Sequence, residues 1–149
     1  MVNNIKKTPL YDAHIELGAK IVDYYSFKMP LQYDSIISEH KNVRSSAGLF
    51  DISHMGEILV DGKGATEFVQ KIITNDISKL SDYQALYTPI CDEEGGTIDD
   101  VIVYKYNSER YMLVVNCGTT KRDLKWINKY KTDDTNINDL SNKLSLLAV

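Results

Sequence analysis

Three polar side chains that can form hydrogen bonds fall within one stretch of the chain. Tyr87, Asp100 and Asn116 supply a phenol, a carboxylate and an amide. A fixed carboxylate can orient a donor by hydrogen bonding, accept a proton and stabilise a developing positive charge. Asp100 is unusual because it stands beside valine and isoleucine, whereas Asp is depleted in strands and costly to bury.

The stretch that carries these residues, 83–117, has the pattern of a three-stranded meander. Three runs rich in β-branched and aromatic residues cover 85–91, 97–106 and 111–117. Turn residues separate them, first at 92–96 and then at 107–109. Turn residues between such runs indicate two successive hairpins.

The hairpins predict which residues face one another. In an antiparallel hairpin, residues equally far from the turn centre are paired. A first turn centred between Glu93 and Glu94 places Tyr87 opposite Asp100, and a second centred on Ser108 places Asp100 opposite Asn116. We therefore expect the three side chains to form a row on one face of the sheet.

The neighbouring carboxylate, Asp99, is expected on the other face, because side chains alternate along a strand. Only one of the pair Asp99 and Asp100 can then point into a given pocket. The alternative is that the Asp100 face of the sheet is simply solvated and that Asp100 lies in water.

A methionine precedes another expected strand. Met55 ends the segment Asp51-Ile52-Ser53-His54-Met55, directly before Gly56. Methionine is an adaptable lining for aromatic ligands. The alternative is that Met55 is an ordinary core residue.

Composition favours an ordinary globular chain. It has 149 residues, 43% hydrophobic, with a net charge of −4 and no basic cluster, so nucleic acid is an unexpected partner. No apolar run is long enough to span a membrane. Cys91 and Cys117 are expected to be reduced. His14, His40 and His54 are too scattered to suggest a metal site.

The whole pattern predicts an α+β fold with helices on one face of an antiparallel sheet. The expected helices are 10–17, 35–46, 64–74 and 119–130. The expected strands outside the meander are 20–25, 49–53, 56–60 and 144–149. Residues 1–9 are expected to form a loose arm, Met29-Pro30 to end its segment, and 131–138 to form a polar loop.

Several stretches together resemble the glycine cleavage system T-protein family, the aminomethyltransferases. The long and specific blocks are VRSSAGLFDISHMGE, within the match over 29–58, and EEGGTIDDVIVY, within the match over 85–106. The stretches TPLYDAHIELGAKIVDY (8–24), TNDISKL (74–80), YMLVVN (111–116) and LSNKLSLLAV (140–149) also match. The resemblance covers nearly the whole chain. The family's proteins are more than twice this length, so this chain resembles an N-terminal portion.

The resemblance implies a folate-binding fold of several domains. Residues 1–50 would be the N-terminal segment of the first domain, and 51–139 an inserted ferredoxin-like subdomain containing the meander. Residues 140–149 would be the strand with which the chain returns to the first domain, cut short. An exposed strand at that end invites pairing with another copy of the chain.

The resemblance also implies an activity. The family transfers an aminomethyl group from the lipoyl arm of the carrier H-protein to tetrahydrofolate, releasing ammonia and forming methylenetetrahydrofolate. Asp100 maps to the family's catalytic aspartate, and Met55, Tyr87 and Asn116 map to folate-contacting positions. Tetrahydrofolate is then a co-substrate, no metal is required, and the 149-residue chain alone is expected to be inactive.

Two departures from the family concern the shape of the folate channel. Before Met29 the family usually has a segment of the type FAGW, whereas this chain has Tyr-Ser-Phe-Lys without the glycine. After the VVN motif the family commonly has an asparagine, whereas this chain has Cys117-Gly118-Thr119. The alternatives are a folate-binding relative that maintains iron–sulfur clusters, or a related folate-dependent demethylase. The start of the chain lacks a presequence pattern, which favours a bacterial cytoplasm over a mitochondrial matrix.

Overall fold

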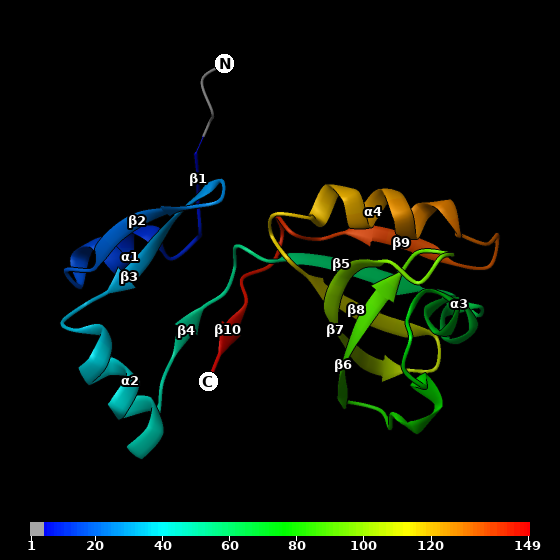
Figure 1. Cartoon of the computed structure of the whole chain (residues 1–149), viewed down its shortest axis with the longest axis horizontal. Coiled ribbons are helices and arrows are strands. Elements are labelled where there is room, and N and C mark those ends of the chain that lie inside the picture. The colour runs from blue at the N-terminus through cyan, green and yellow to red at the C-terminus, as the bar shows by residue number, and fades with distance from the viewer. Residues whose placement is uncertain (1–4) are drawn as a thin grey trace. The chain divides into compact units, whose positions relative to one another are not determined.

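The computed structural model describes residues 5–149, which form two compact units (Figure 1). The first unit includes the chain up to His54 and the segment Ser145–Val149, and the second is Met55–Leu144. These divisions fall a few residues after those expected at 50/51 and 139/140. The part of the expected arm over residues 1–4 lies outside the described residues.

The second unit is built on a five-stranded sheet with the order β6-β7-β8-β5-β9. Its strands are β5 (Gly56–Asp61), β6 (Ala85–Cys91), β7 (Thr97–Asn107), β8 (Arg110–Val115) and β9 (Asn136–Asp139). Every neighbouring pair is antiparallel. The meander β6-β7-β8 starts and ends within a few residues of the predicted positions.

Two helices, α3 (Ala65–Ile72) and α4 (Thr120–Lys129), pack on one face of this sheet, as the sequence predicted. A short 3-10 helix, η1 (Ile77–Lys79), adds to the same core. Val69 of α3 and Ile127 of α4 are fully buried there against side chains at alternate strand positions, which are also fully buried: Ile58, Val60, Ile90, Val101, Val103, Tyr111, Leu113 and Val115. Burial of this apolar surface provides the main driving force for folding of the unit.

The connections make this unit ferredoxin-like. The order of β5, α3, β7, β8, α4 and β9 along the chain is strand-helix-strand-strand-helix-strand. In space the four strands lie in the order β7-β8-β5-β9, and β6 is added at the edge beside β7. Strands β5 and β7 run in the same direction and are joined through α3, with β8 between them. Strands β8 and β9 are likewise joined through α4, with β5 between them. These two split strand-helix-strand units are typical of the ferredoxin-like fold. The α+β expectation is therefore confirmed.

The expectation of a polar loop over 131–138 is wrong in its last part. β9 pairs with β5 from Asn136↔Asp61 to Asp139↔Ile58. The segment NIND has few residues that favour strands, and only one of its side chains packs against the core. Backbone pairing at a sheet edge tolerates such residues, so composition conceals this strand.

The first unit contains a small sheet with the order β1-β3-β2. Its elements are β1 (Lys6–Lys7), α1 (Tyr11–Glu16), β2 (Lys20–Tyr24), β3 (Phe27–Gln32), α2 (Ile36–Ser45), β4 (Phe50–Asp51) and β10 (Leu147–Ala148). The arm is therefore partly a strand, and β3 runs through Pro30 instead of ending there. β1 pairs only with Phe27 and Lys28, so Pro30 lies where β3 has a partner on one side only.

Helix α2 begins as the sequence predicted, with Ser35 at the N-cap accepting a bond from the Ser38 backbone. Its apolar side chains are exposed, however; Ile36 and Ile37 are 55% and 67% exposed. The spacing of the apolar residues therefore predicted the helix correctly, but it did not show that these residues remain exposed. No helix within residues 5–149 is long and apolar enough to cross a membrane.

Candidate functional site

The candidate site lies on the face of the β6-β7-β8 meander opposite the helices. A tight turn joins β6 to β7, in which the Asp92 carboxylate accepts bonds from the backbone N–H of Glu94 (3.1 Å) and Gly96 (2.6 Å). Gly95 has a positive φ of 86°, which glycine adopts without a steric cost. This turn sets the register of the hairpin that carries Tyr87 and Asp100.

The predicted register of the first hairpin is wrong by two residues. Tyr87 pairs with Ile102, and Asp100 pairs with Pro89. The pair Cys91↔Thr97 centres the turn on Glu94, half a residue later than expected, which shifts the pairing by one residue, and the bulge between Ile90 and Cys91 shifts it by one more. A shift of two keeps every side chain on its face, so Tyr87 and Asp100 still share one.

Tyr87 and Asp100 are in direct contact. The Tyr87 hydroxyl donates a 2.7 Å hydrogen bond to Oδ2 of Asp100. This bond is the main cause that raises the pKa of the Tyr87 phenol above its usual value. Both residues are exposed, and Tyr87 is 63% exposed. The phenol and carboxylate thus form a pair that a ligand on this face can reach.

Asn116 joins the same group from the third strand. The register of β7 and β8, with Ile102 opposite Val114, places Asn116 opposite Asp100, as predicted. The Asn116 amide nitrogen lies 3.1 Å from the backbone oxygen of Asp100 and 3.3 Å from its Oδ1. The structure therefore brings together the three side chains that the sequence singled out.

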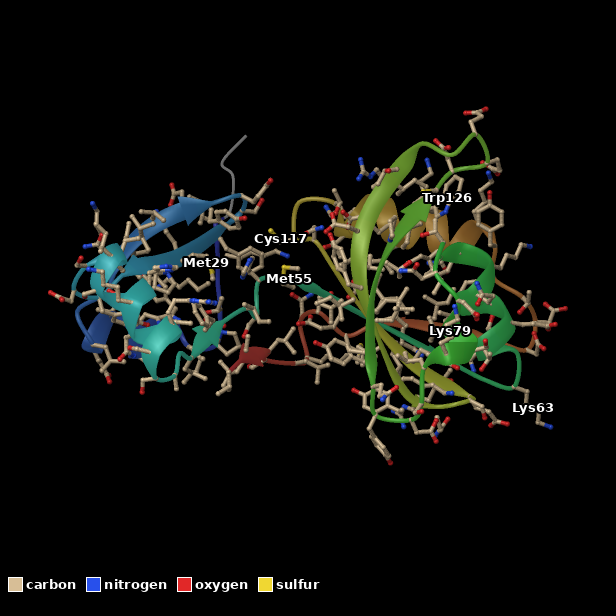
Figure 2. The ribbon with its side chains drawn as sticks, turned by 60° about the horizontal axis from the view of Figure 1, so that its bottom comes forward. Met29, Met55, Lys63, Lys79, Cys117 and Trp126 are labelled. Carbon is tan, nitrogen blue, oxygen red and sulfur yellow. The ribbon has the colours of Figure 1, made fainter. Side chains whose placement is uncertain are left out.

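Met55 directly precedes β5, the strand that neighbours β8 in the sheet. Gly56 pairs with Val115, and continuing that register by one residue sets Met55 opposite Asn116. Figure 2 shows Met55 where β5 begins and Cys117 just after β8 ends. Met55 is half-buried. The four candidate residues therefore come from β6, β7, the residue that follows β8 and the residue that precedes β5.

Asp99 belongs to this group as well, which the alternation argument did not foresee. Its side chain is on the helix side of the sheet and only 6% exposed. Nevertheless its Oδ1 lies 2.9 Å from the Asn116 amide nitrogen. Asn116 follows the last residue of β8 and can reach acceptors on both sides of β7. The sequence feature that could have identified Asp99 is the presence of an aspartate at a strand position whose side chain faces the core.

A separate polar cluster lies in the first unit. His14 is 6% exposed and bridges the Tyr33 hydroxyl at 2.7 Å and Asp51 Oδ2 at 2.9 Å. Burial alone would raise the pKa of Asp51, but hydrogen bonds, including those from His14 and Ser53, hold it below its usual value. His14 therefore serves as a buried hydrogen-bonding residue, which its scattered position in the sequence did not indicate.

No group of three or more His, Cys, Asp or Glu side chains within residues 5–149 is arranged to hold a metal ion. Both cysteines, Cys91 and Cys117, are free thiols.

The chain is similar to known proteins in its sequence and in its fold. The model of the GCVT N-terminal domain matches residues 10–149. The chain belongs to this family.

Proteins with sequences similar to this chain are named aminomethyltransferases. The aminomethyltransferase of Caldanaerobacter subterraneus subsp. tengcongensis is 50% identical over 149 residues, covering 99% of this chain and 40% of that protein. The aminomethyltransferase of Staphylococcus carnosus is 46% identical, covering 100% of this chain and 41% of that protein. The chain thus spans about two fifths of the length of the curated relatives it matches.

A solved structure supports the same assignment of the GCVT fold. The glycine cleavage system aminomethyltransferase T from Bartonella henselae superposes with a TM-score of 0.85 at 34% sequence identity. The match covers 92% of this chain and 38% of that one. The resemblance deduced from the sequence motifs is therefore confirmed, and so is its restriction to a portion of the family's length.

Proposed function

We propose that this chain forms the N-terminal part of an aminomethyltransferase of the glycine cleavage system. Its reaction is the transfer of an aminomethyl group from the lipoyl arm of the H-protein to tetrahydrofolate, with release of ammonia. The single observation that carries the proposal is the cluster of Tyr87, Asp100 and Asn116 on one exposed face of the sheet. The relatives' names support the reaction class.

The cluster fits a reduced pterin, which presents N–H donors and a flat ring. Asp100 takes part in no ion pair within residues 5–149, so its charge is available to a ligand. Tyr87 offers an exposed aromatic ring beside that carboxylate. A planar amine that stacks on the ring and donates to the carboxylate satisfies both groups.

Asp100 has the central chemical role in this proposal. The substrate amine must lose a proton when it forms a bond to the transferred carbon, and positive charge develops at that carbon. A carboxylate held by Tyr87 and Asn116 orients the amine and stabilises the positive charge without reorganising during the reaction. Asn116 and Tyr87 position Asp100, and Met55 supplies an adaptable apolar contact beside them.

The proposed partners follow from the donor. The aminomethyl group is carried on the lipoyl arm of the H-protein, so that protein must dock near this face. The proposal requires no metal and no nucleic acid. We expect the compartment to be the cytoplasm, because the relatives named above are bacterial proteins.

The test is calorimetric titration of 5-formyltetrahydrofolate into the 149-residue chain and its Asp100→Ala variant. Asp100→Ala removes every oxygen with which this side chain can accept a hydrogen bond from the ligand, so binding is expected to weaken by about tenfold or more. Asp133→Ala is the matched control, since it removes an exposed carboxylate in the turn after α4. Equal binding by wild type and Asp100→Ala would contradict the proposal; absence of binding by both would require the same pair in a chain of the family's full length.

A further inference from the structure

Two aspartates lie buried behind the candidate site, on the helix side of the sheet. Asp99 comes from β7 and is 6% exposed, and Asp123 comes from α4 and is fully buried. Burying a charge is costly unless it is paired or fully hydrogen-bonded. Two neighbouring carboxylates in such a place therefore need an explanation.

Asp99 has the hydrogen bonds that a buried carboxylate requires. Its Oδ2 accepts from the Asn116 backbone N–H at 3.2 Å and from the Thr119 hydroxyl at 2.8 Å. Its Oδ1 accepts from the Asn116 side-chain amide at 2.9 Å. Burial alone would raise the pKa of Asp99, but these bonds outweigh it and hold the pKa below its usual value. Asp99 is therefore the ionised member of the pair.

Asp123 has no comparable donors among the described residues. Neither of its oxygens receives a hydrogen bond from a side chain or the backbone within residues 5–149. The single Thr119 hydroxyl proton is directed to Asp99, and Arg122 Nε lies 3.9 Å from Asp123 Oδ1, beyond hydrogen-bond distance. The Arg122 guanidinium instead donates to the backbone oxygen of Ile98.

An ionised Asp123 would be an unpaired buried anion next to another anion. Burial, followed by the bond to Asp99 and its charge, raises the pKa of Asp123 to about 7. The charged groups that face Asp123 are Asp99 from β7 and Arg122 from α4 itself. Protonation turns Asp123 into a donor for Asp99, so that one proton satisfies both carboxyl groups.

We propose that Asp99 is a positioning residue for the Asp100–Asn116 site, and that protonated Asp123 holds Asp99 in place from α4. The amide nitrogen of Asn116 carries two protons, one of which is directed to Asp99 on the buried side. The other is thereby directed to Asp100, 3.1 Å away at the backbone oxygen and 3.3 Å at Oδ1. The buried pair thus sets the orientation of an amide on the exposed face.

The close approach of α4 to the sheet makes this arrangement possible. At the start of α4, the Thr119 backbone N–H and the Thr120 hydroxyl donate to the backbone oxygen of Asn116 at 3.2 and 2.9 Å. A Cβ on Gly56 would lie 2.7 Å from Thr120 Cγ2, so only glycine permits this separation. The first turn of α4, which carries Asp123, is therefore held against the strand ends of the site.

The first experiment needs no ligand. The side-chain amide signals of Asn116 are followed by nuclear magnetic resonance in asparagine-labelled chain from pH 5.5 to 8.5, with Asn116→Asp to assign them. In the wild type we expect these signals to move with a midpoint near 7, as Asp123 loses its proton. In Asp123→Asn, which donates to Asp99 at every pH, the signals should stay in place across the range.

Asp99→Asn should shift the Asn116 amide signals towards those of a free amide, while Asp133→Asn should leave them unchanged. If Asp99→Asn does not fold, Asp123→Asn still decides the matter. Asn116 signals that are independent of pH in the wild type, or that titrate equally in Asp123→Asn, would overturn the proposal. A purely structural role for the pair would change stability but would not link the Asn116 amide to this proton.

The second experiment rests on the proposed function. Asp99→Asn should weaken binding of 5-formyltetrahydrofolate by about tenfold, the effect of losing one well-made hydrogen bond, with Asp133→Asn unaffected. Unchanged binding in a folded Asp99→Asn variant would overturn the positioning role. If neither the 149-residue wild type nor a chain of the family's full length binds the folate, the proposed function fails, whereas the ligand-free resonance experiment still tests the buried pair.

Discussion

The phenol of Tyr87 donates a 2.7 Å hydrogen bond to Asp100 although the two residues are not paired across the strands. Tyr87 pairs with Ile102, so the bond runs diagonally to the next position on the same face. Side chains at such diagonal positions remain within reach when one of them is aromatic. The site therefore depends on a shared face and a long side chain rather than on direct opposition.

The diagonal bond can be tested through the pKa of Tyr87. Because the bond to Asp100 raises this pKa, Asp100→Asn should lower it towards the ordinary tyrosine value. The measurement is a pH titration of carbon-13-labelled tyrosine, with Tyr87→Phe to assign the signal. A tyrosine titration that is the same in Asp100→Asn and wild type would show that the bond does not form in solution.

Replacement of Asp100 should separate binding from chemistry. In a chain of the family's full length that carries this sequence, Asp100→Asn retains the shape of the side chain but removes the charge. We expect folate affinity to change by less than about tenfold and kcat to fall by about a hundredfold or more. Steady-state formation of methylenetetrahydrofolate measures both parameters, and an unchanged kcat would exclude a catalytic role for Asp100.

Because of the buried carboxyl group of Glu57, the free energy of unfolding of the second unit should fall as the pH rises. It is 1% exposed, and neither carboxylate oxygen has a hydrogen-bond partner among the described residues. Burial, with a smaller effect from Asp139, raises its pKa from 4.5 to about 7. Because the folded-state pKa is the higher one, this contribution is complete below about pH 4.5 and is lost as the pH rises through 7.

Glu57→Gln should therefore flatten the dependence of stability on pH. Between pH 5 and pH 8, the wild type should lose on the order of 2 kcal/mol more unfolding free energy than the variant. Urea unfolding followed by fluorescence of Trp126, which lies on α4 in the same unit, measures this difference. Asp133→Asn is the control, and parallel losses in wild type and Glu57→Gln would contradict the argument.

Gly56→Ala should destabilise the second unit by overpacking. The added Cβ would lie 2.7 Å from both Thr120 and Val115 side-chain atoms. Overpacking of this kind typically costs about 1–3 kcal/mol. Because Thr120 is one of the two residues contacted, Thr120→Ala should restore part of the loss in a double-mutant cycle measured by urea unfolding. Strict additivity of the two substitutions would show that the residues do not touch.

Much of the second unit was accessible from local patterns. The meander strands were recognised from turn residues between β-prone runs, and α3 was recognised from apolar positions that are all buried in the structure. The common face of Tyr87, Asp100 and Asn116 followed from the two-residue period of a strand. These features depend on neighbours within a few residues, which the sequence displays directly.

Other features were decided by contacts between distant parts of the chain. The bulge at Ile90 changed the register, and the strand β9 formed from polar residues because β5 offered it backbone partners. Asp99 and Asp123 meet only because α4 packs against the end of the sheet, which Gly56 permits. The sequence alone therefore determined the family, the strands of the meander and the residues of the exposed face. The tertiary structure decided which of these residues touch, because such contacts depend on packing between elements and not on local periodicity.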